Sequence, residues 1–349
     1  MSEVSSSVLY MDNDPTAEER KKDHIELAFQ SQVEVPQLDP RFYYEPLFAA
    51  HPTKGTPYGS IPFLGKTMRA PVWVSSMTGG TKMANTINHN LAKVCGEFGM
   101  GMGLGSCRAL LYSDEYLKDF AVRSLIGEDN PLYANLGVAQ LQQLIDSNEL
   151  YRIYQLLDKL EADGLIIHIN PFQEWMQPEG DIYTKSPLET IETILEKMDV
   201  RIIVKEVGQG MGYESLKTLL QMPLEAVDFA ASGGTNFSML ELLRSDAEKK
   251  AAYTNLAHVG HSAAEMVKMC NQLKGEVGDK MRCQQLIISG GVKDFLDGYY
   301  LIEKANFSAV YGQASGFLKH AQGSYEQLYQ HVERQIEGLK LAKAYLKVR

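Results

Sequence analysis

The residues best suited to chemistry in this chain lie in the stretch His168-Ile169-Asn170-Pro171-Phe172-Gln173-Glu174. It follows Gly164-Leu165-Ile166-Ile167, a short apolar run typical of a fully buried strand, and Pro171 fixes the turn that comes after it. An imidazole, two amides and a carboxylate therefore gather where a buried strand ends, which in parallel α/β folds is where ligands bind. Four polar groups so close together favour chemistry over the simpler alternative, a polar strand end satisfied by backbone hydrogen bonds.

A cation and a second carboxylate, Lys205 and Glu206, follow the apolar run 202–204 in the same way. Lys205 either pairs with a core carboxylate, Glu206 or Asp228, or faces an electron-rich atom of a ligand, and its place at a strand end favours the ligand. Glu174 and Glu206 are the best acidic candidates for metal binding or acid/base work. A single Glu suits Mg²⁺, which completes its coordination shell with ligand phosphate and water.

Glycine-rich segments follow three further apolar runs, at Ser232-Gly233-Gly234-Thr235, at Ser289-Gly290-Gly291 and at Gly312-Gln313-Ala314-Ser315-Gly316. Each could be a tight turn and nothing more. Three of them after the last strands of one chain instead favour a phosphate site, because exposed backbone N–H groups attract anions without any net charge. Ser232 and Thr235 could add hydroxyl groups to it.

The elements that must position these residues are eight short strands separated by helical patterns, such as 148–162 and 188–198. This alternation predicts βαβ units with parallel pairing, and eight units in a chain of this length predict an α/β fold, a (β/α)8 TIM barrel. The predicted strands are Pro71–Ser75, Gly99–Gly103, Leu132–Asn135, Leu165–His168, Arg201–Lys205, Ala226–Ala230, Leu286–Ser289 and Ser308–Gly312.

We expect a single domain, residues 1–349, with barrel strands over about 71–312 and a C-terminal helix over about 323–347. Three regions do not fit the repeat: an N-terminal arm, residues 1–66; the loop after the fourth strand; and an insertion at about 236–284. In the arm, Glu19-Arg20-Lys21-Lys22-Asp23-His24 is either a solvated helix end or a clamp that holds a diphosphate through Arg20 and Lys21.

Composition narrows the class of protein. Of the 349 residues, 44% are hydrophobic and 22% charged, as in a soluble globular protein, and the formal net charge of −10 argues against nucleic-acid or anionic-membrane partners. The four cysteines show no metal-type spacing, so we expect reduced thiols. No signal-peptide pattern or membrane-length apolar run is present, and we expect a cytoplasmic location.

Taken together, the motifs resemble those of the type 2 isopentenyl-diphosphate isomerases, FMN-dependent barrel enzymes that interconvert isopentenyl and dimethylallyl diphosphate. The resemblance covers nearly the whole chain, and its most specific part combines the 168–174 stretch with the Arg-Lys arm. The other matching segments are Ser75-Ser76-Met77-Thr78-Gly79-Gly80, Gly105-Ser106-Cys107-Arg108, Asn135-x-Gly137, Val204-Lys205-Glu206-Val207-Gly208, Gly233-Gly234-Thr235-Asn236 and Ser289-Gly290-Gly291.

The resemblance implies a role for each matching residue. Gln173, His168, His24 and Lys205 would be catalytic, and Glu174 would bind the Mg²⁺ that bridges to the diphosphate. The substrate would be held by Arg20, Lys21, Ser106, Arg108 and Gln173. The residues that would bind FMN are Ser76, Met77, Thr78, Ser106, Asn135, Lys205, Thr235, Gly290, Gly291, Lys293, Ala314 and Ser315. The resemblance also implies NADPH as the reductant of FMN and a homo-oligomer, a tetramer or larger.

Three positions depart from the family pattern. Lys293 and Ser315 stand where Arg is usual, and Cys107 stands where Gln is usual. Because two fork-shaped guanidinium donors are missing, the departures predict weaker FMN binding.

Two other functions compete with the isomerase. An FMN-dependent 2-hydroxy-acid oxidase would share the barrel, but its pattern has a His before Gly-Gly-Arg where this chain has Ser232-Gly233-Gly234-Thr235. A catalytically silent phosphate-binding barrel would not need Gln173, Glu174 and Lys205 together. The isomerase is therefore the preferred hypothesis, with reduced FMN as the proton carrier.

Overall fold

The computed structural model describes residues 16–75 and 83–349. It contains two compact units, Met1–Tyr43 with Arg349 and Tyr44–Val348, and each is described by itself. In the first unit, helix α1 (Ala17–Leu27) has Glu18 and Glu19 in its first turn, where carboxylates stabilise the helix dipole. A single 3₁₀ turn, η1 (Val35–Gln37), follows, and strand β1 (Phe42–Tyr44) begins at the end of this unit.

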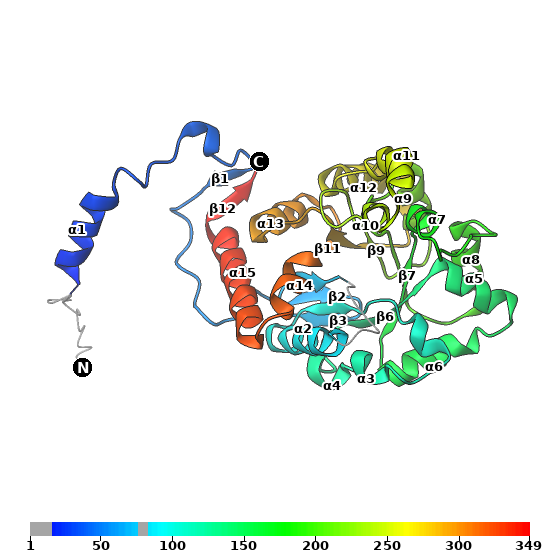
Figure 1. The fold of residues 1–349 in the computed structure, drawn as a ribbon. Helices are drawn as coiled ribbons and strands as arrows, with labels where there is room; N and C mark the ends of the chain where they lie inside the picture. The colour runs from blue at the N-terminus through cyan, green and yellow to red at the C-terminus, as the bar shows by residue number, and fades with distance from the viewer. Residues whose placement is uncertain (1–15, 76–82) are drawn as a thin grey trace. The chain divides into compact units, whose positions relative to one another are not determined.

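The second unit is built on a closed barrel of eight parallel strands in the order β10-β11-β4-β5-β6-β7-β8-β9, with β9 paired to β10 (Figure 1). Each strand coincides with one of the eight predicted from the sequence, which confirms the (β/α)8 barrel. The strands are β4 (Val72–Val74), β5 (Gly101–Gly103), β6 (Leu132–Gly137), β7 (Gly164–His168), β8 (Ile202–Lys205), β9 (Ala226–Asp228), β10 (Gln285–Ser289) and β11 (Ser308–Gln313).

A short antiparallel hairpin, β2 (Ile61–Phe63) and β3 (Lys66–Met68), covers the amino-terminal end of the barrel. At its turn the Leu64 N–H donates to the side chain of Gln285, the first residue of β10 (2.8 Å). Apolar side chains of the hairpin and of seven barrel strands then form one core cluster, which comprises Phe63, Leu64, Met68, Trp73, Tyr133, Ile166, Ile203, Ala226, Ile287 and Val310. Because this end of the barrel is filled by apolar packing, polar chemistry is left to the carboxyl ends of the strands.

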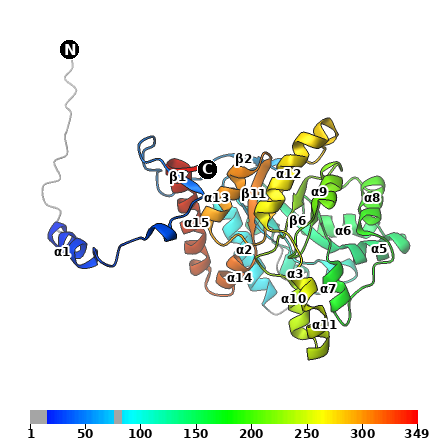
Figure 2. The ribbon, with the colours of Figure 1, turned by 90° about the horizontal axis from the view of Figure 1, so that it is seen from above.

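Helices connect the strands and surround the barrel (Figures 1 and 2). The predicted helices at 148–162 and 188–198 are α6 and α8, and α8 begins with a capping box between Ser186 and Glu189. None of the helices in the described ranges is long and apolar enough to cross a membrane. The helices and remaining short elements are α2 (Ala84–Phe98), η2 (Arg108–Leu111), α3 (Leu117–Phe120), α4 (Arg123–Ile126), α5 (Val138–Asp146), α6 (Tyr151–Leu160), α7 (Pro171–Met176), α8 (Pro187–Lys197), α9 (Tyr213–Leu220), α12 (Ala263–Val277), η3 (Gly278–Lys280), α13 (Phe295–Lys304), α14 (Ser315–Ala321), α15 (Tyr325–Tyr345) and β12 (Leu346–Val348).

The insertion predicted at about 236–284 contains two additional helices, α10 (Phe237–Arg244) and α11 (Ala247–Ala257), before α12. Side chains of Asn236 and Asp246 cap their first turns. Both views place α10 and α11 beside α7, and Met176 of α7 packs with Leu242 and Ala257 in a small separate core. The insertion therefore packs against α7, the helix that contains the last residues of the 168–174 stretch.

Candidate active site

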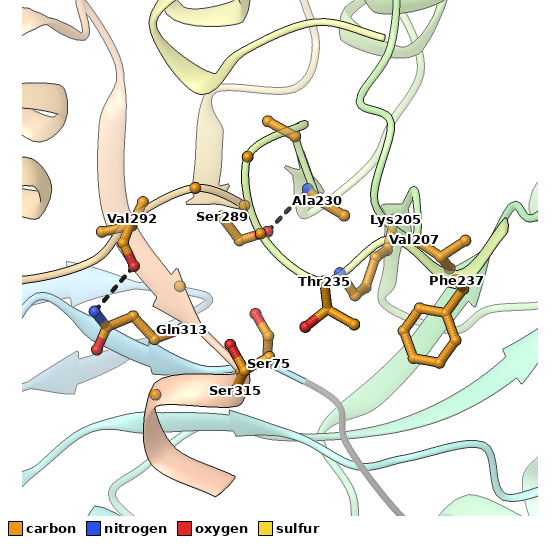
Figure 3. A pocket seen from close by; sticks show the side chains of 18 of the residues that line it. Ser75, Lys205, Val207, Ala230, Thr235, Phe237, Ser289, Val292, Gln313 and Ser315 are labelled. Atoms are coloured by element: carbon orange, nitrogen blue, oxygen red, sulfur yellow. Dashed lines mark hydrogen bonds between the residues drawn. The ribbon is translucent and has the colours of Figure 1, made fainter. Parts of the chain in front are cut away.

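A cavity of about 450 Å³ lies at the carboxyl ends of the strands. Residues at or just after the ends of all eight barrel strands line it, together with Gln173 of α7 and Phe237 of α10. Figure 3 shows Val292 and Gln313 on one side of the cavity and Val207 and Phe237 on the other. Its size lies within the range of small-molecule sites.

Eleven of the predicted site residues line this cavity: Ser106, Asn135, His168, Gln173, Lys205, Thr235, Gly290, Gly291, Lys293, Ala314 and Ser315. Ser76, Met77 and Thr78 lie outside the described residues. Arg20, Lys21 and His24 belong to the first unit, where they are exposed on α1. Arg108 lines an adjoining cavity of about 540 Å³, whose lining also includes Ser106.

Lys205 pairs with a core carboxylate, one of the two roles predicted for it, and it also lines the cavity. Its Nζ lies 3.4 Å from Oδ2 of Asp228, whose side chain is 0% exposed. The other oxygen of Asp228 accepts a hydrogen bond from Ser289 Oγ, which in turn accepts one from the Ala230 N–H (2.9 Å). The buried carboxylate thus holds a cation at the cavity floor and is itself anchored to β10.

His168 is held as a neutral imidazole. Asn135 donates from Nδ2 to the Leu104 carbonyl (3.1 Å), so that its Oδ1 faces His168 Nδ1 at 2.7 Å. Nδ1 therefore carries the proton, and Nε2 is left as an acceptor. Burial, together with the nearby Lys205 cation, lowers the pKa of His168 from 6.5 to about 4. At neutral pH this side chain can accept a proton or a hydrogen bond but does not add positive charge.

Gln173 is fixed by two partners, and one of them was not predicted from the sequence. Its Oε1 accepts from Asn170 Nδ2 (3.0 Å), and its Nε2 donates to Oε1 of Glu241 on α10 (3.4 Å). Glu241 is buried, and Arg244 donates to its other oxygen (2.8 Å). In the sequence Glu241 has the spacing of an ordinary helical ion pair, so only the packing of α10 on α7 reveals that it orients Gln173.

Glu174 projects from the same helix as Gln173 but does not line the main cavity. Its two oxygens accept from Asn170 Nδ2 and from the Asp181 N–H, both at 2.8 Å. Each oxygen keeps a lone pair, so the half-buried carboxylate can still ligate a cation. Among the described residues no group of three His, Cys, Asp or Glu side chains is arranged to hold a metal ion. One carboxylate fits Mg²⁺ better than a metal that requires a full protein cage.

Arg108 is engaged in an ion pair beside these residues. Its Nη1 donates to Oδ2 of Asp181 at 2.9 Å, and Gln140 donates to the same oxygen at 3.0 Å. The Arg108 side chain is 55% exposed. Because an exposed pair of this kind contributes little stability, the guanidinium is available to a stronger anion.

Glu206, the second predicted acidic candidate, has a structural role. Its Oε2 accepts the backbone N–H groups of Gly208, Gln209 and Gly210 at 2.6, 2.6 and 3.0 Å, which ties down the loop after β8. Burial raises the pKa of Glu206, and the three amides oppose that shift.

The glycine-rich wall of the cavity depends on backbone conformations that favour glycine. Gly290 and Gly291 have φ angles of +88° and +72°. A Cβ at Gly290 would lie 2.1 Å from the carbonyl oxygen of Ala231, so no side chain fits there. The N–H groups of Gly291 and Val292 donate to no acceptor within the described ranges, although both residues line the cavity. These two N–H groups are available to an anion, and the glycine pattern predicts a phosphate site at this wall.

Curated relatives of the chain are isopentenyl-diphosphate delta-isomerases. The chain is 34% identical over 331 residues to the one from Rickettsia peacockii, which covers 93% of this chain and 92% of the relative. For the relative from Rickettsia felis the identity is 33% over 336 residues, covering 93% and 91%. No protein-family model matches the chain.

Solved structures with a similar fold include a flavocytochrome b2 double mutant with sulfite bound, at a TM-score of 0.57 and 15% identity, covering 87% of this chain and 71% of that one. A mandelate oxidase mutant with the monooxide FMN adduct has a TM-score of 0.50 and 10% identity, covering 86% and 87%. At such low identity these likenesses show the fold alone.

Proposed function

Since the chain belongs to the isopentenyl-diphosphate delta-isomerase family, we propose that it interconverts isopentenyl and dimethylallyl diphosphate with reduced FMN in the cavity and Mg²⁺ at Glu174. The observation that carries the proposal is the convergence of Gln173, His168 and Lys205 on one cavity whose lining is also rich in glycine. The proposal includes NADPH as the reductant, a cytoplasmic location and a homo-oligomer of four or more chains.

The residues present in the cavity fit FMN. The Gly291 and Val292 N–H groups suit its phosphate, and the Lys205 cation suits an electron-rich ring edge. Ser75 Oγ lines the cavity, is buried, and has no hydrogen-bond partner in the part of the chain that the structure describes. A buried hydroxyl without a partner is unfavourable unless a ligand supplies one. Reduced FMN, when bound, would supply the acid/base group for alkene carbons that offer protein side chains no polar handle.

Neutral side chains of the protein would orient the substrate, and they would add no further charge to the site. Gln173, held between Asn170 and Glu241, would position the diphosphate end of the substrate relative to the flavin. His168 would present its Nε2 acceptor and stay neutral, as its lowered pKa requires. Both side chains are fixed before substrate arrives, so little ordering is needed on binding.

The diphosphate would supply binding energy at a distance from the reacting carbons. We propose that Glu174 would hold Mg²⁺, which would neutralise charge on the diphosphate, and that Arg108 would exchange Asp181 for a phosphate oxygen. Ser106 lines both cavities. On the first unit, Arg20 and Lys21 remain proposed diphosphate ligands and His24 a proposed catalytic residue.

The test is anaerobic incubation with isopentenyl diphosphate, FMN, a reductant and Mg²⁺, followed by quantification of dimethylallyl diphosphate. We expect product that disappears when either flavin reduction or Mg²⁺ is withheld. Product formed without flavin would refute the FMN assignment, and no product from a protein that binds reduced FMN would refute the substrate. Oxidation of lactate or glycolate in a parallel assay would instead support the hydroxy-acid oxidase.

A further inference from the structure

A chain of buried amide side chains connects the C-terminal helix α15 to the glycine-rich wall of the cavity. Gln335 of α15 donates from Nε2 to Gln313 Oε1 at 3.0 Å, and Gln313, at the end of β11, donates from Nε2 to the Val292 carbonyl at 3.1 Å. Gln335 also accepts from Tyr311 Oη at 3.1 Å and contacts His331 Nε2 at 2.8 Å. Gln335 is 7% exposed and Gln313 is 5% exposed, so water does not replace these bonds.

The direction of every bond in this chain follows from one group that can only accept. The Val292 carbonyl must face the Nε2 of Gln313, which turns Gln313 Oε1 toward Gln335. Gln335 must then present its own Nε2, so its Oε1 is left for the Tyr311 hydroxyl. Its second N–H points at His331 Nε2, which has to be unprotonated. Reversing any one amide would place two donors or two acceptors against each other.

The surroundings of His331 keep that acceptor available. Burial, together with the nearby His320, Arg334 and Lys319, lowers the pKa of His331 from 6.5 to about 4. The His320 ring stacks on it with centroids 4.1 Å apart. His331 is therefore neutral at working pH and fixes the far end of the amide chain.

The near end of the chain fixes a peptide plane in the loop after β10. The Val292 carbonyl is bonded to Gln313, while the N–H of the same peptide, that of Lys293, donates to Asp297 Oδ2 at 2.9 Å. Gly290 and Gly291, which have positive φ angles, precede this peptide plane. Ordering a glycine costs more backbone conformational entropy than ordering any other residue. A plane held on both sides sets the direction of the free N–H groups of Gly291 and Val292.

We propose that Gln335 is a positioning residue for the cofactor phosphate: through Gln313 it holds the Gly290–Val292 loop so that its free N–H groups point into the cavity. Gln335 does not line the cavity and acts without touching a ligand. The phosphate part of this inference rests on the proposed function, whereas the effect on the loop does not.

The test compares Gln335→Met with Gln330→Met, a matched control on the same helix whose exposed side chain donates to Glu326. Dissociation constants are measured for FMN and for riboflavin, which lacks the phosphate. We expect Gln335→Met to weaken FMN binding about tenfold, equal to about 1.4 kcal/mol, while riboflavin binding stays within twofold. Gln330→Met should leave both unchanged. Hydrogen exchange of peptides covering 286–297, measured without flavin, should be faster only in Gln335→Met.

Equal weakening of FMN and riboflavin would overturn the proposal, because a general packing defect affects both ligands. Unchanged exchange in 286–297 would also overturn it, whether or not flavin binds. If the unaltered protein binds neither flavin, the proposed function fails on that point, and the exchange measurement alone still decides whether Gln335 holds the loop.

Discussion

The ion pair of Lys205 and Asp228 allows a quantitative test of the site. Replacing Asp228 with Asn keeps the shape of the side chain but removes the charge that balances Lys205. At the observed 3.4 Å, with an effective dielectric constant of about 20, the attraction between the two charges is about 5 kcal/mol. Removing one partner of a buried pair costs about 3–5 kcal/mol. Because Lys205 also faces the cavity, we expect Asp228→Asn to lower the free energy of unfolding by about 3 kcal/mol.

The reverse change, Lys205→Met, should cost a similar amount, because Asp228 is 0% exposed and would lose the cation that pairs with it. The double variant contains neither charge, so its loss should be about 2 kcal/mol rather than the sum of the two single losses. Urea unfolding without flavin gives the free energy of unfolding of the unaltered protein, the two single variants and the double variant. A double variant whose loss equals that sum to within about 0.5 kcal/mol would refute the reasoning, since additivity means that the two groups do not interact.

Three further outcomes follow from the contacts of single residues. Gln173→Leu should lower kcat/KM about tenfold or more, which is the usual cost of a lost hydrogen bond to a charged group, and should leave FMN affinity unchanged. Steady-state kinetics measures the first effect and a flavin titration the second. An equal loss of kcat/KM and of FMN affinity would contradict this prediction. Glu174→Gln should raise the Mg²⁺ concentration for half-maximal activity about tenfold, because the ligand charge is gone; an unchanged Mg²⁺ titration would remove Glu174 from the metal site. The pKa of His168 is lowered from 6.5 to about 4, so the unfolded state binds one more proton between these values and stability falls as pH falls. The loss of stability between pH 7 and pH 4 should therefore be about 3 kcal/mol smaller in His168→Gln than in the unaltered protein. The same dependence of the free energy of unfolding on pH in both proteins would contradict this.

The strands of the barrel were predictable because each is a short apolar run that ends in polar or glycine residues. Ile202–Lys205 and Gln285–Ser289 show this pattern most clearly, since parallel strands are buried on both faces. The hairpin formed by β2 and β3 was not predicted: its residues 61–66 lie in the predicted N-terminal arm, and Thr67 and Met68 lie just after it. Its two strands have three residues each, too few for an alternating pattern to stand out.

The lining residues that lie at strand ends were predictable, because the carboxyl ends of the barrel strands meet at one rim. Asn135, Lys205 and Gly290 belong to three different strand ends, and knowing the barrel is enough to bring them together. Glu241 and Gln335 were not predictable, because each acts through a contact between elements that are far apart in the sequence. Their neighbours in sequence, Arg244 and His331, suggest only local helical pairs.

The rim, rather than the barrel, decides the chemistry of this chain. Flavocytochrome b2, mandelate oxidase and the present chain share the barrel at 10–15% identity, so the barrel does not distinguish their chemistry. The segment after β9 does, because Ser232 occupies the position of the His in the hydroxy-acid oxidase pattern and Thr235 that of the Arg. Ser232 Oγ donates to the Gln209 carbonyl (3.4 Å), and Thr235 lines the cavity with a neutral hydroxyl. Neither can remove a proton from a hydroxy acid or pair with its carboxylate. An oxidase reaction would therefore need a base and a cation from other residues of the rim.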